Sequence, residues 1–454
     1  MEPRQVRNAA DARRIVQERG LRHVKVGVHD IDGVLRGKYL HIDKFSSALD
    51  GGMGFCDVVL GWDSNDQLYD NVTYTGWHTA YPDASVRILP ETCRDIATEP
   101  GNLLFLAEFA DKAEEICPRG VLRRVLDRAR SMGFEVKVGF EYEFFVFAET
   151  AFSIREKGYR NLKPISPGFF GYSMLRNSVL SDFYRDLLAM CETMDMGIEG
   201  LHTETGAGVL EAALRVRDGL QAADAAALFK LYTKVLAQKR DWLATFMAKW
   251  SKDWPGCGGH MHMSLWKDGR PAFFDESAPH RMSQTMRQFV GGQRALMPEV
   301  LSMVASTVNS YRRLIPGFWA PTASTWGVEN RTTSLRVIPG SAKSTRVEYR
   351  VAAADANPYL ALAAAIGSGL WGIEHGVDPG EPIQGNSYAL EHPDDMQLPR
   401  TLMDAAGRLK ASKPARALFG DAFVDHYAAT RDWEEREFRK AITDWELDRY
   451  MEII

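Results

Sequence analysis

The sequence predicts an α+β fold in which a small N-terminal sheet domain precedes a much larger second domain. Strand signals dominate the first 109 residues. The stretch "HVKVGVHDIDGVLRGKYLHI" (23–42) alternates apolar and polar residues around Asp32-Gly33, a strong hairpin signal, and "LLFLAEF" (103–109) ends the region. After residue 118, strands with polar residues alternate with long helical stretches. We therefore divide the 454 residues into domains 1–111 and 112–454.

Helices are expected before the first hairpin and throughout the second domain. "ARRIVQERG" (12–20) has helical periodicity, and "PRGVLRRVLDRARSMG" (118–133) has Pro near its start and Gly at its end. Further helical stretches are 180–195, 222–240 and 359–376. Residues 421–454 read as helical and amphipathic, so one face of this segment should be buried.

The composition is that of an ordinary globular protein, with 45% hydrophobic and 25% charged residues. A net charge of −5 gives no electrostatic footprint for nucleic acid. The N-terminus has no apolar signal region and no run approaches the roughly 18 apolar residues of a membrane span, so we expect a cytoplasmic protein without a membrane partner. The five scattered cysteines support neither disulfides nor a thiolate zinc site.

Two glutamates share one face of a predicted strand. In "FEVKVGFEYEFFVF" (134–147), period-two alternation puts the aromatic and aliphatic residues on one face and Glu141 and Glu143 on the other. A pair of this kind is usually a solvated sheet face. The apolar wrapping of the segment makes a binding role more plausible here.

Two further strands carry polar residues at the same spacing. "GGHMHMSLW" (258–266) points His260 and His262 one way, which suits a ligand role as well as a structural one. "STRVEYRVA" (344–352) puts Arg346, Glu348 and Arg350 on one face, which is either a salt-bridge ladder or a site for a cation and anionic oxygens.

The remaining polar motifs complete one type of site. "HTETGAGVLEAALR" (202–215) sets Glu204 and Glu211 across a glycine-containing turn, and "GVENRTTSLRV" (327–337) offers Arg331 and Arg336. Carboxylates with one or two histidines suit Mg²⁺ or Mn²⁺, and divalent cations with arginines are the equipment for phosphoryl transfer. There is no Walker-type GxxxxGK[ST], so ATP would need another scaffold.

The order and spacing of these motifs resemble the glutamine synthetase family. The match runs through "GFEYEFF", "HTETGAGVLE", "GGHMHMSLW", "NSYRRLIPG", "ENRTTSLRV" and "KSTRVEYRVAAADANPYLALAA", about residues 139–370. The resemblance implies a large catalytic domain with a curved antiparallel sheet flanked by helices. The N-terminal region fits the family's β-grasp domain more loosely.

The resemblance also implies roles for individual residues. One metal would be bound by Glu143, Glu204 and Glu211, and a second by Glu141, His260 and Glu348. Glutamate would be held by Arg313 at its α-carboxylate, Gly256 at its amino group and Arg350 at its reacting γ-carboxylate. The ATP side would include His262, Ser264, Lys343 and Arg346, while Arg331 and Arg336 would neutralise the transferring phosphate.

The sequence departs from ammonia-using members of the family in the residues that would receive ammonium. The flap glutamate that follows the R-L-x-P-G run is Trp319, in "RRLIPGFWAP" (312–321). The asparagine usual just before Gly256 is Pro255, and the ammonium-binding aspartate has no clean match, with Asp57 and Asp63 as the two candidates. An indole cannot accept a proton from ammonium, but it can stack on an organic amine.

We therefore predict a γ-glutamyl amide synthetase that phosphorylates glutamate and then adds an organic primary amine, favouring an apolar or aromatic one. Such relatives open the catabolism of amines within nitrogen metabolism. Glu329 is a candidate base for the amine. Two alternatives are an ammonia-using enzyme with an unusual flap and a catalytically inactive structural or regulatory relative. The resemblance also implies a homo-oligomer, commonly a dodecamer of two stacked hexameric rings, and a tyrosine loop near Tyr388 for which we predict no modification.

Overall fold

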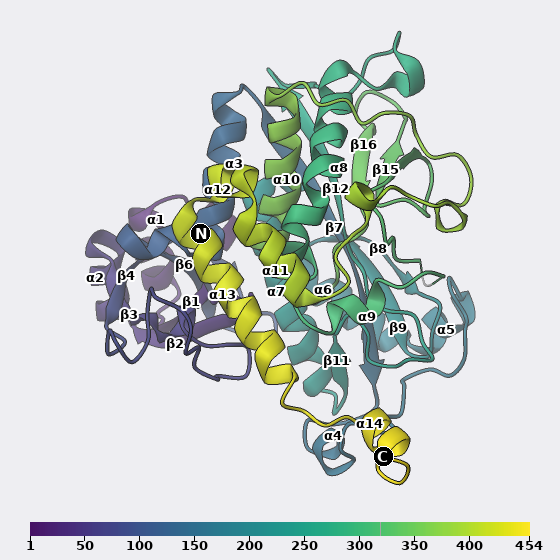
Figure 1. Cartoon of the computed structure of the whole chain (residues 1–454). Helices are drawn as coiled ribbons and strands as arrows, with labels where there is room; N and C mark the ends of the chain where they lie inside the picture. Colours follow the sequence, from purple (N-terminus) through teal and green to yellow (C-terminus); the bar gives the residue numbers. More distant parts are fainter. Residues whose placement is uncertain (318) are drawn as a thin grey trace.

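The computed structural model describes residues 1–317 and 319–454, which form two β-sheets and a set of helices packed around them (Figure 1). The smaller sheet contains β1 (His23–His29), β2 (Leu35–His41), β3 (Met53–Cys56), β4 (Asp83–Ile88), β5 (Arg94–Asp95) and β6 (Leu103–Phe109). The larger sheet contains β7 (Glu135–Phe147), β8 (Ile198–Thr203), β9 (Val209–Leu214), β10 (Arg217–Asp218), β11 (Leu243–Thr245), β12 (Gly259–Lys267), β13 (Arg270–Pro271), β14 (Trp326–Val328), β15 (Leu335–Ile338) and β16 (Arg346–Tyr349).

The helices lie before, between and after these strands. They are α1 (Ala9–Glu18), α2 (Ile42–Gly51), α3 (Pro118–Ser131), α4 (Ser153–Glu156), α5 (Met174–Val179), α6 (Ser181–Thr193), α7 (Gly219–Gln238), α8 (Gln284–Val304), α9 (Ser310–Arg313), α10 (Pro358–Glu374), α11 (Leu402–Ala411), α12 (Lys413–Phe419), α13 (Asp421–Phe438) and α14 (Asp444–Tyr450). In the part of the chain that the structure describes, no helix is long and apolar enough to cross a membrane.

The predicted hairpin opens the N-terminal sheet. β1 and β2 pair antiparallel with Gly27 opposite Gly37, and β1 pairs parallel with β6 on its other side. The strand order is β2-β1-β6-β4-β3, with β5 also on β6. The predicted boundary at 111/112 falls inside a short 3-10 helix (Asp111–Glu115) that connects β6 to α3, and the boundary stays a prediction.

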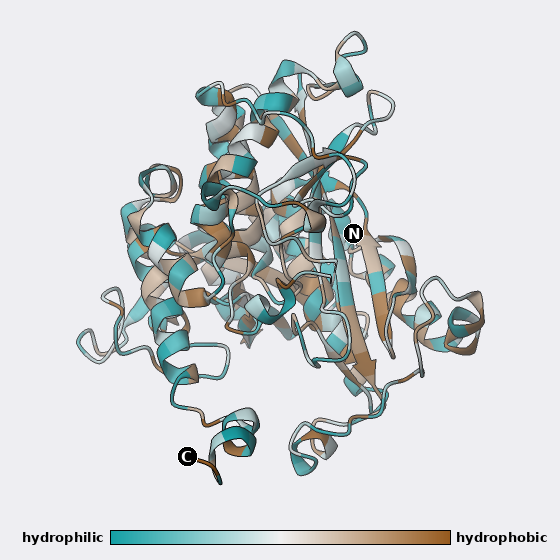
Figure 2. Ribbon diagram, turned by 45° about the vertical axis from the view of Figure 1, so that its right-hand side comes forward, coloured by the Kyte–Doolittle hydropathy of each residue, from teal (hydrophilic) through white to brown (hydrophobic). Residues whose placement is uncertain are grey.

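The larger sheet has the order β14-β15-β16-β12-β7-β9-β8, and its central pairings are antiparallel. Helix α7 covers one face of β7, where the Phe229 ring lies 6.2 Å from Tyr142 and 5.9 Å from Phe144. Figure 2 shows hydrophilic and hydrophobic residues following one another along the strands and helices. Because α7 buries the apolar face of β7, the face with Glu141 and Glu143 is left for other partners.

Two long helices behind this sheet pack at glycines. A Cβ on Gly292 of α8 would lie 2.5 Å from the Gly372 Cα of α10 and 2.2 Å from the Ser368 carbonyl oxygen. Only glycine permits this close approach of the two backbones. The predicted α+β fold with a helix-flanked sheet is confirmed, although the amphipathic C-terminal stretch is two helices, because α13 ends at Phe438 and Thr443 caps a separate α14.

Buried polar contacts join the N-terminal sheet to the helices of the larger domain. Arg119 of α3 donates to Glu108 of β6 (2.7 Å) and to Asp224 of α7 (3.0 Å). Arg431 of α13 donates to Asp32 in the first hairpin (2.7 Å). These charges are paired, so their burial fixes the relative position of the two parts instead of leaving orphaned ions.

Candidate active site

Polar side chains cross one face of the larger sheet in a continuous row. Directly paired positions share a sheet face, and the register brings together the pairs His202–Glu211, Glu143–Glu211, Glu141–His260, His262–Glu348 and Arg336–Glu348. Six neighbouring strands, β15, β16, β12, β7, β9 and β8, therefore contribute to the row. Glu141 and Glu348, which are 207 positions apart in the sequence, meet because of this strand order.

A cavity of about 610 Å³ lies over this row. Every residue that the sequence assigned to a metal, to glutamate or to the transferring phosphate lines it, as does Trp319. The lining residues are Glu141, Glu143, Tyr172, His202, Glu204, Thr205, Val209, Glu211, Pro255, Gly256, His260, Arg313, Trp319, Arg331, Arg336, Glu348 and Arg350.

One group of possible metal ligands consists of His202, Glu204 and Glu211, whose ligand atoms lie within 4.8 Å of one another. Burial raises the pKa of Glu211 to about 9, and the neighbouring carboxylate of Glu143 adds to the shift. Burial and Glu143 also raise the pKa of Glu204. Negative charge therefore accumulates here beyond what the protein neutralises, which is the electrostatic environment that a divalent cation relieves.

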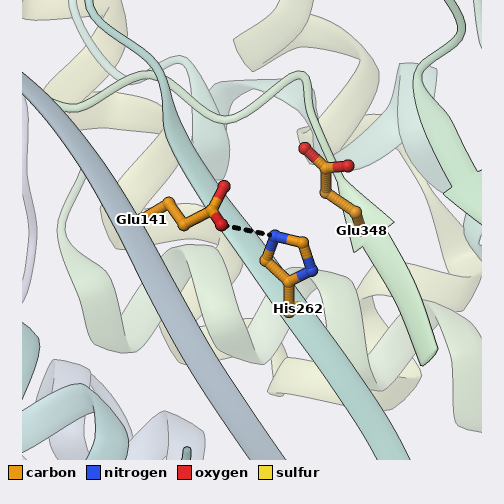
Figure 3. A group of neighbouring side chains, drawn as sticks. All are labelled: Glu141, His262 and Glu348. Atoms are coloured by element: carbon orange, nitrogen blue, oxygen red, sulfur yellow. Dashed lines mark ion pairs between the residues drawn. The ribbon is translucent and has the colours of Figure 1, made fainter. Parts of the chain in front are cut away.

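A second group consists of Glu141, His262 and Glu348, again within 4.8 Å (Figure 3). The three side chains come from adjacent strands and converge, with His262 Nε2 3.1 Å from Glu141 Oε1. His260 Nδ1 lies 3.7 Å from Glu141 and 3.6 Å from Glu348. Although burial opposes it, the two imidazoles lower the pKa of Glu141, and Arg350 lowers that of Glu348. Carboxylates with imidazole fit Mg²⁺ or Mn²⁺.

Arginines surround the carboxylates. Arg350 was expected inside the strand 344–352 but lies one residue after β16, which ends at Tyr349, and its Nη1 donates to Glu348. Arg336 donates to Glu348 from Nη1 (3.0 Å) and to Glu329 from Nε (3.0 Å). By contrast, Arg331 makes no ion pair or side-chain hydrogen bond with any described residue, so its guanidinium is available for an anion.

The predicted glutamate-binding corner is tightly built. Arg313 is buried, and its guanidinium donates to the carbonyls of Val351 (2.9 Å) and Arg350 (3.2 Å). A Cβ on Gly256 would lie 2.5 Å from the Ala248 carbonyl oxygen and 2.8 Å from Arg313 Cγ. Glycine is therefore required at 256, where its backbone lies against the arginine.

The predicted ATP residues do not line this cavity and lie on β12, on β16 and in the turn before β16. Arg346 Nε donates to His262 Nδ1 (3.1 Å), so His262 belongs both to the predicted ATP residues and to the second ligand group. Ser264 lies two residues further along β12 and accepts from Trp266 Nε1 (3.1 Å). Lys343 is exposed in the turn before β16 and has no ion pair with a described residue.

The flap presents the indole of Trp319 to the cavity, at the position that the sequence comparison assigned to a glutamate in ammonia-using members. Trp319 lines the cavity, is 61% exposed and has a φ of 57°, which is unusual for a bulky residue. Tyr172 also has a positive φ, of 55°, and its ring stacks on His202 at 4.4 Å. Backbone strain of this kind concentrates at functional sites.

The other candidates for the amine pocket lie elsewhere. Glu329 does not line the cavity, and its carboxylate is paired with Arg336, so its proposed role as a base finds no support. Asp57 is buried and accepts from Thr75 (2.6 Å), and Asp63 caps its own exposed loop through Gln67 N (2.8 Å). Tyr388 also lies outside the cavity.

Sequence reasoning missed four lining residues: Tyr172, His202, Thr205 and Val209. His202 stands two positions before Glu204, and period-two alternation could have placed both on one face. Tyr172 had no signal, because hydrogen bonds to Thr203, including Tyr172 N to the Thr203 carbonyl at 2.7 Å, bring its segment to the site.

Comparisons with known proteins agree with this geometry. The family profile described as "Glutamine synthetase, catalytic domain" matches residues 115–450. A protein of Dictyostelium discoideum called type-1 glutamine synthetase 2 is 46% identical over 438 residues, covering 95% of this chain and 84% of that protein. A glutamate–isopropylamine ligase of Pseudomonas is 34% identical over 451 residues, with 97% of both chains covered.

Two further similarities involve other amines and a solved structure. A γ-glutamylethanolamide synthetase of Streptomyces coelicolor is 34% identical over 428 residues, covering 93% of this chain and 91% of that protein. The solved structure of a GmaS/ADP complex superposes with a TM-score of 0.85 at 26% identity, covering 97% of this chain and 99% of the other.

Proposed function

We propose that this chain, which belongs to the glutamine synthetase family, joins the γ-carboxylate of glutamate to an organic primary amine and hydrolyses ATP in the process. The family and the relatives make it an ATP-dependent glutamate–amine ligase. The finer statement, that the amine has an apolar or aromatic body and that the reaction serves amine catabolism, is the proposal.

The residues of the cavity suit the two stages of such a reaction. Bound Mg²⁺ or Mn²⁺ would neutralise phosphate charge, held by the two ligand groups with Glu143 and His260. Arg313 and the backbone at Gly256 would hold the amino-acid end of glutamate, and Arg350 its γ-carboxylate. Arg331 and Arg336 would stabilise the phosphoryl group as it moves from ATP to that carboxylate, which turns an oxygen into a leaving group.

The choice of amine rests on one observation about the second substrate's side of the cavity. Among the residues that the structure describes, the carboxylates lining it are Glu141, Glu143, Glu204, Glu211 and Glu348, and all five belong to the proposed metal sites. No described carboxylate remains to attract ammonium. The indole of Trp319 offers apolar surface instead, and covering about 60 Å² of an amine's body would contribute roughly 1.5 kcal/mol, or about tenfold in affinity.

A second candidate is an ammonia-using enzyme, because the 46% identical relative carries the name of a glutamine synthetase. A catalytically inactive relative is the third. The intact set of carboxylates, histidines and arginines in one cavity argues against an inactive relative.

Assembly into two stacked hexameric rings stays a prediction that mass photometry tests.

The test measures phosphate release with ATP, glutamate and Mg²⁺ for ammonium, ethanolamine, isopropylamine and benzylamine. We expect the best organic amine to exceed ammonium at least tenfold in kcat/KM. Ammonium as the best substrate would make the amine assignment wrong, and no release with any amine would favour the inactive relative.

A matched pair of variants locates the effect. Trp319→Glu should lower kcat/KM for the best organic amine about tenfold and narrow its advantage over ammonium. Trp445→Glu is the control, because Trp445 on α14 is also 61% exposed and lies outside the cavity. If Trp319→Glu behaves like Trp445→Glu, Trp319 is not part of the amine pocket.

A further inference from the structure

We propose that a second cavity, on the other side of the flap, is a binding site for a small anion with two or more negative charges. This cavity has a volume of about 780 Å³ and shares no described lining residue with the active-site cavity. The flap forms one of its walls through Leu314, Ile315 and Pro316, just before Trp319.

The charges that line the second cavity are all positive. Lys249, Lys252, Arg312 and Arg400 line it, and no acidic residue does so among the residues described. Lys252, Arg312 and Arg400 form no ion pair and no side-chain hydrogen bond with any described residue. Lys249 Nζ donates to the Trp254 carbonyl, so the case for an anion depends on the other three cations.

Another cavity lined by several cations differs from this one because it contains acidic partners. The other large arginine-rich hollow is lined by Arg119 and Arg217, but it also contains Asp195 and Asp224. There Arg217 pairs with Asp195 at 2.9 Å and Arg119 with Asp224 at 3.0 Å. In the flap-side cavity, Lys252, Arg312 and Arg400 face one space without such partners among the described residues, so an anion would remove their mutual repulsion.

The donors also fit multivalent anions better than monovalent ones. Arg312 and Arg400 offer planar guanidinium forks that match carboxylate or phosphate oxygens, and Lys252 adds a compact charge. They come from three separate segments, so a single anionic group cannot use all of them with equal ease. A polycarboxylate or a phosphoryl compound has the required shared chemistry.

The site is adjacent to the active site through α9. This short helix carries Arg312 at the flap-side cavity and Arg313 at the active-site cavity, in consecutive positions. The proposed site is nevertheless tested by binding alone and needs neither the amine nor turnover, so its failure is distinct from failure of the proposed function.

The experiment is isothermal titration calorimetry of the full chain in metal-free buffer at fixed ionic strength. The probes are propane-1,2,3-tricarboxylate, inorganic phosphate and, as a monovalent control, acetate. We expect saturable binding of at least one multivalent probe and none of acetate. Binding of the tricarboxylate alone indicates a carboxylate ligand, and binding of phosphate alone indicates a phosphoryl ligand.

Variants place the bound anion. Arg400→Gln and Lys252→Gln should each weaken binding of the multivalent probe at least tenfold. Arg22→Gln removes an exposed arginine on the distant N-terminal sheet and should leave binding unchanged. The proposal is overturned if neither multivalent probe saturates, or if Arg400→Gln and Lys252→Gln bind the probe as tightly as Arg22→Gln does.

Discussion

Glu211 should make the metal-free protein lose stability as the pH rises. Its side chain is half-buried beside Glu143, Glu141 and Glu204, and partial burial with these neighbouring carboxylates raises its pKa from 4.5 to about 9. At neutral pH the folded state therefore keeps a proton on Glu211 that the unfolded state releases. The perturbation that isolates this effect is Glu211→Gln, which keeps the side chain's size and removes the titration.

The sign and size follow from proton linkage. A carboxyl whose folded pKa is raised gives its full contribution below pH 4.5, and that contribution is lost as the pH rises toward about 9. One proton of difference corresponds to about 1.4 kcal/mol of unfolding free energy per pH unit. Between pH 6 and 8, the unfolding free energy of the metal-free wild type should therefore fall by roughly 1–3 kcal/mol more than that of Glu211→Gln.

The assay is urea unfolding at pH 6 and pH 8 in EDTA, for wild type, Glu211→Gln and the exposed control Glu199→Gln. Saturating Mg²⁺ should abolish the difference in wild type, because a bound cation favours the ionised carboxylate. If metal-free wild type and Glu211→Gln have the same pH dependence, the carboxylates are not crowded as the structure indicates, and the reasoning fails.

Three further predictions concern transfer, metal affinity and packing. Arg331→Gln should lower kcat about 100-fold while the KM for glutamate changes less than about threefold in steady-state kinetics, because Arg331 has no structural partner among the described residues and would act on the transferring phosphate. His202→Asn should weaken Mn²⁺ binding about 10- to 100-fold by calorimetry, and unchanged affinity would remove His202 from the ligand set. Gly292→Ala should cost about 2–3 kcal/mol of unfolding free energy, since its Cβ would meet the Ser368 carbonyl at 2.2 Å, whereas Gly407→Ala on α11 meets nothing within 4 Å and should be neutral or stabilising.

The local part of the site could be predicted from the sequence because it depends on periodicity. Alternation alone placed Glu141 with Glu143 and His260 with His262, and the structure confirms both shared faces. The major helices were also recognisable from their apolar spacing and end residues. For example, the stretch 222–240 corresponds to α7 at Gly219–Gln238.

The rest depends on which strands become neighbours. Nothing in "GGHMHMSLW" says that β12 lies between β7 and β16, yet this order is what brings His262 to both Glu141 and Glu348. Tyr172 reaches the cavity only through hydrogen bonds from its loop to β8. Such contacts join distant segments, and a single sequence has no periodic signal for them.

The row of polar residues divides the site into parts that can change separately. Neighbouring hydrogen-bonded strands lie about 4.8 Å apart, so the sheet fixes the spacing between the carboxylates and histidines on its polar face. Trp319 and Tyr172, by contrast, stand on connecting segments. Substitutions on these connecting segments can change which amine is accepted while the sheet keeps the metal and phosphate ligands in place. Relatives with this fold can therefore differ in amine substrate and share one phosphoryl-transfer chemistry.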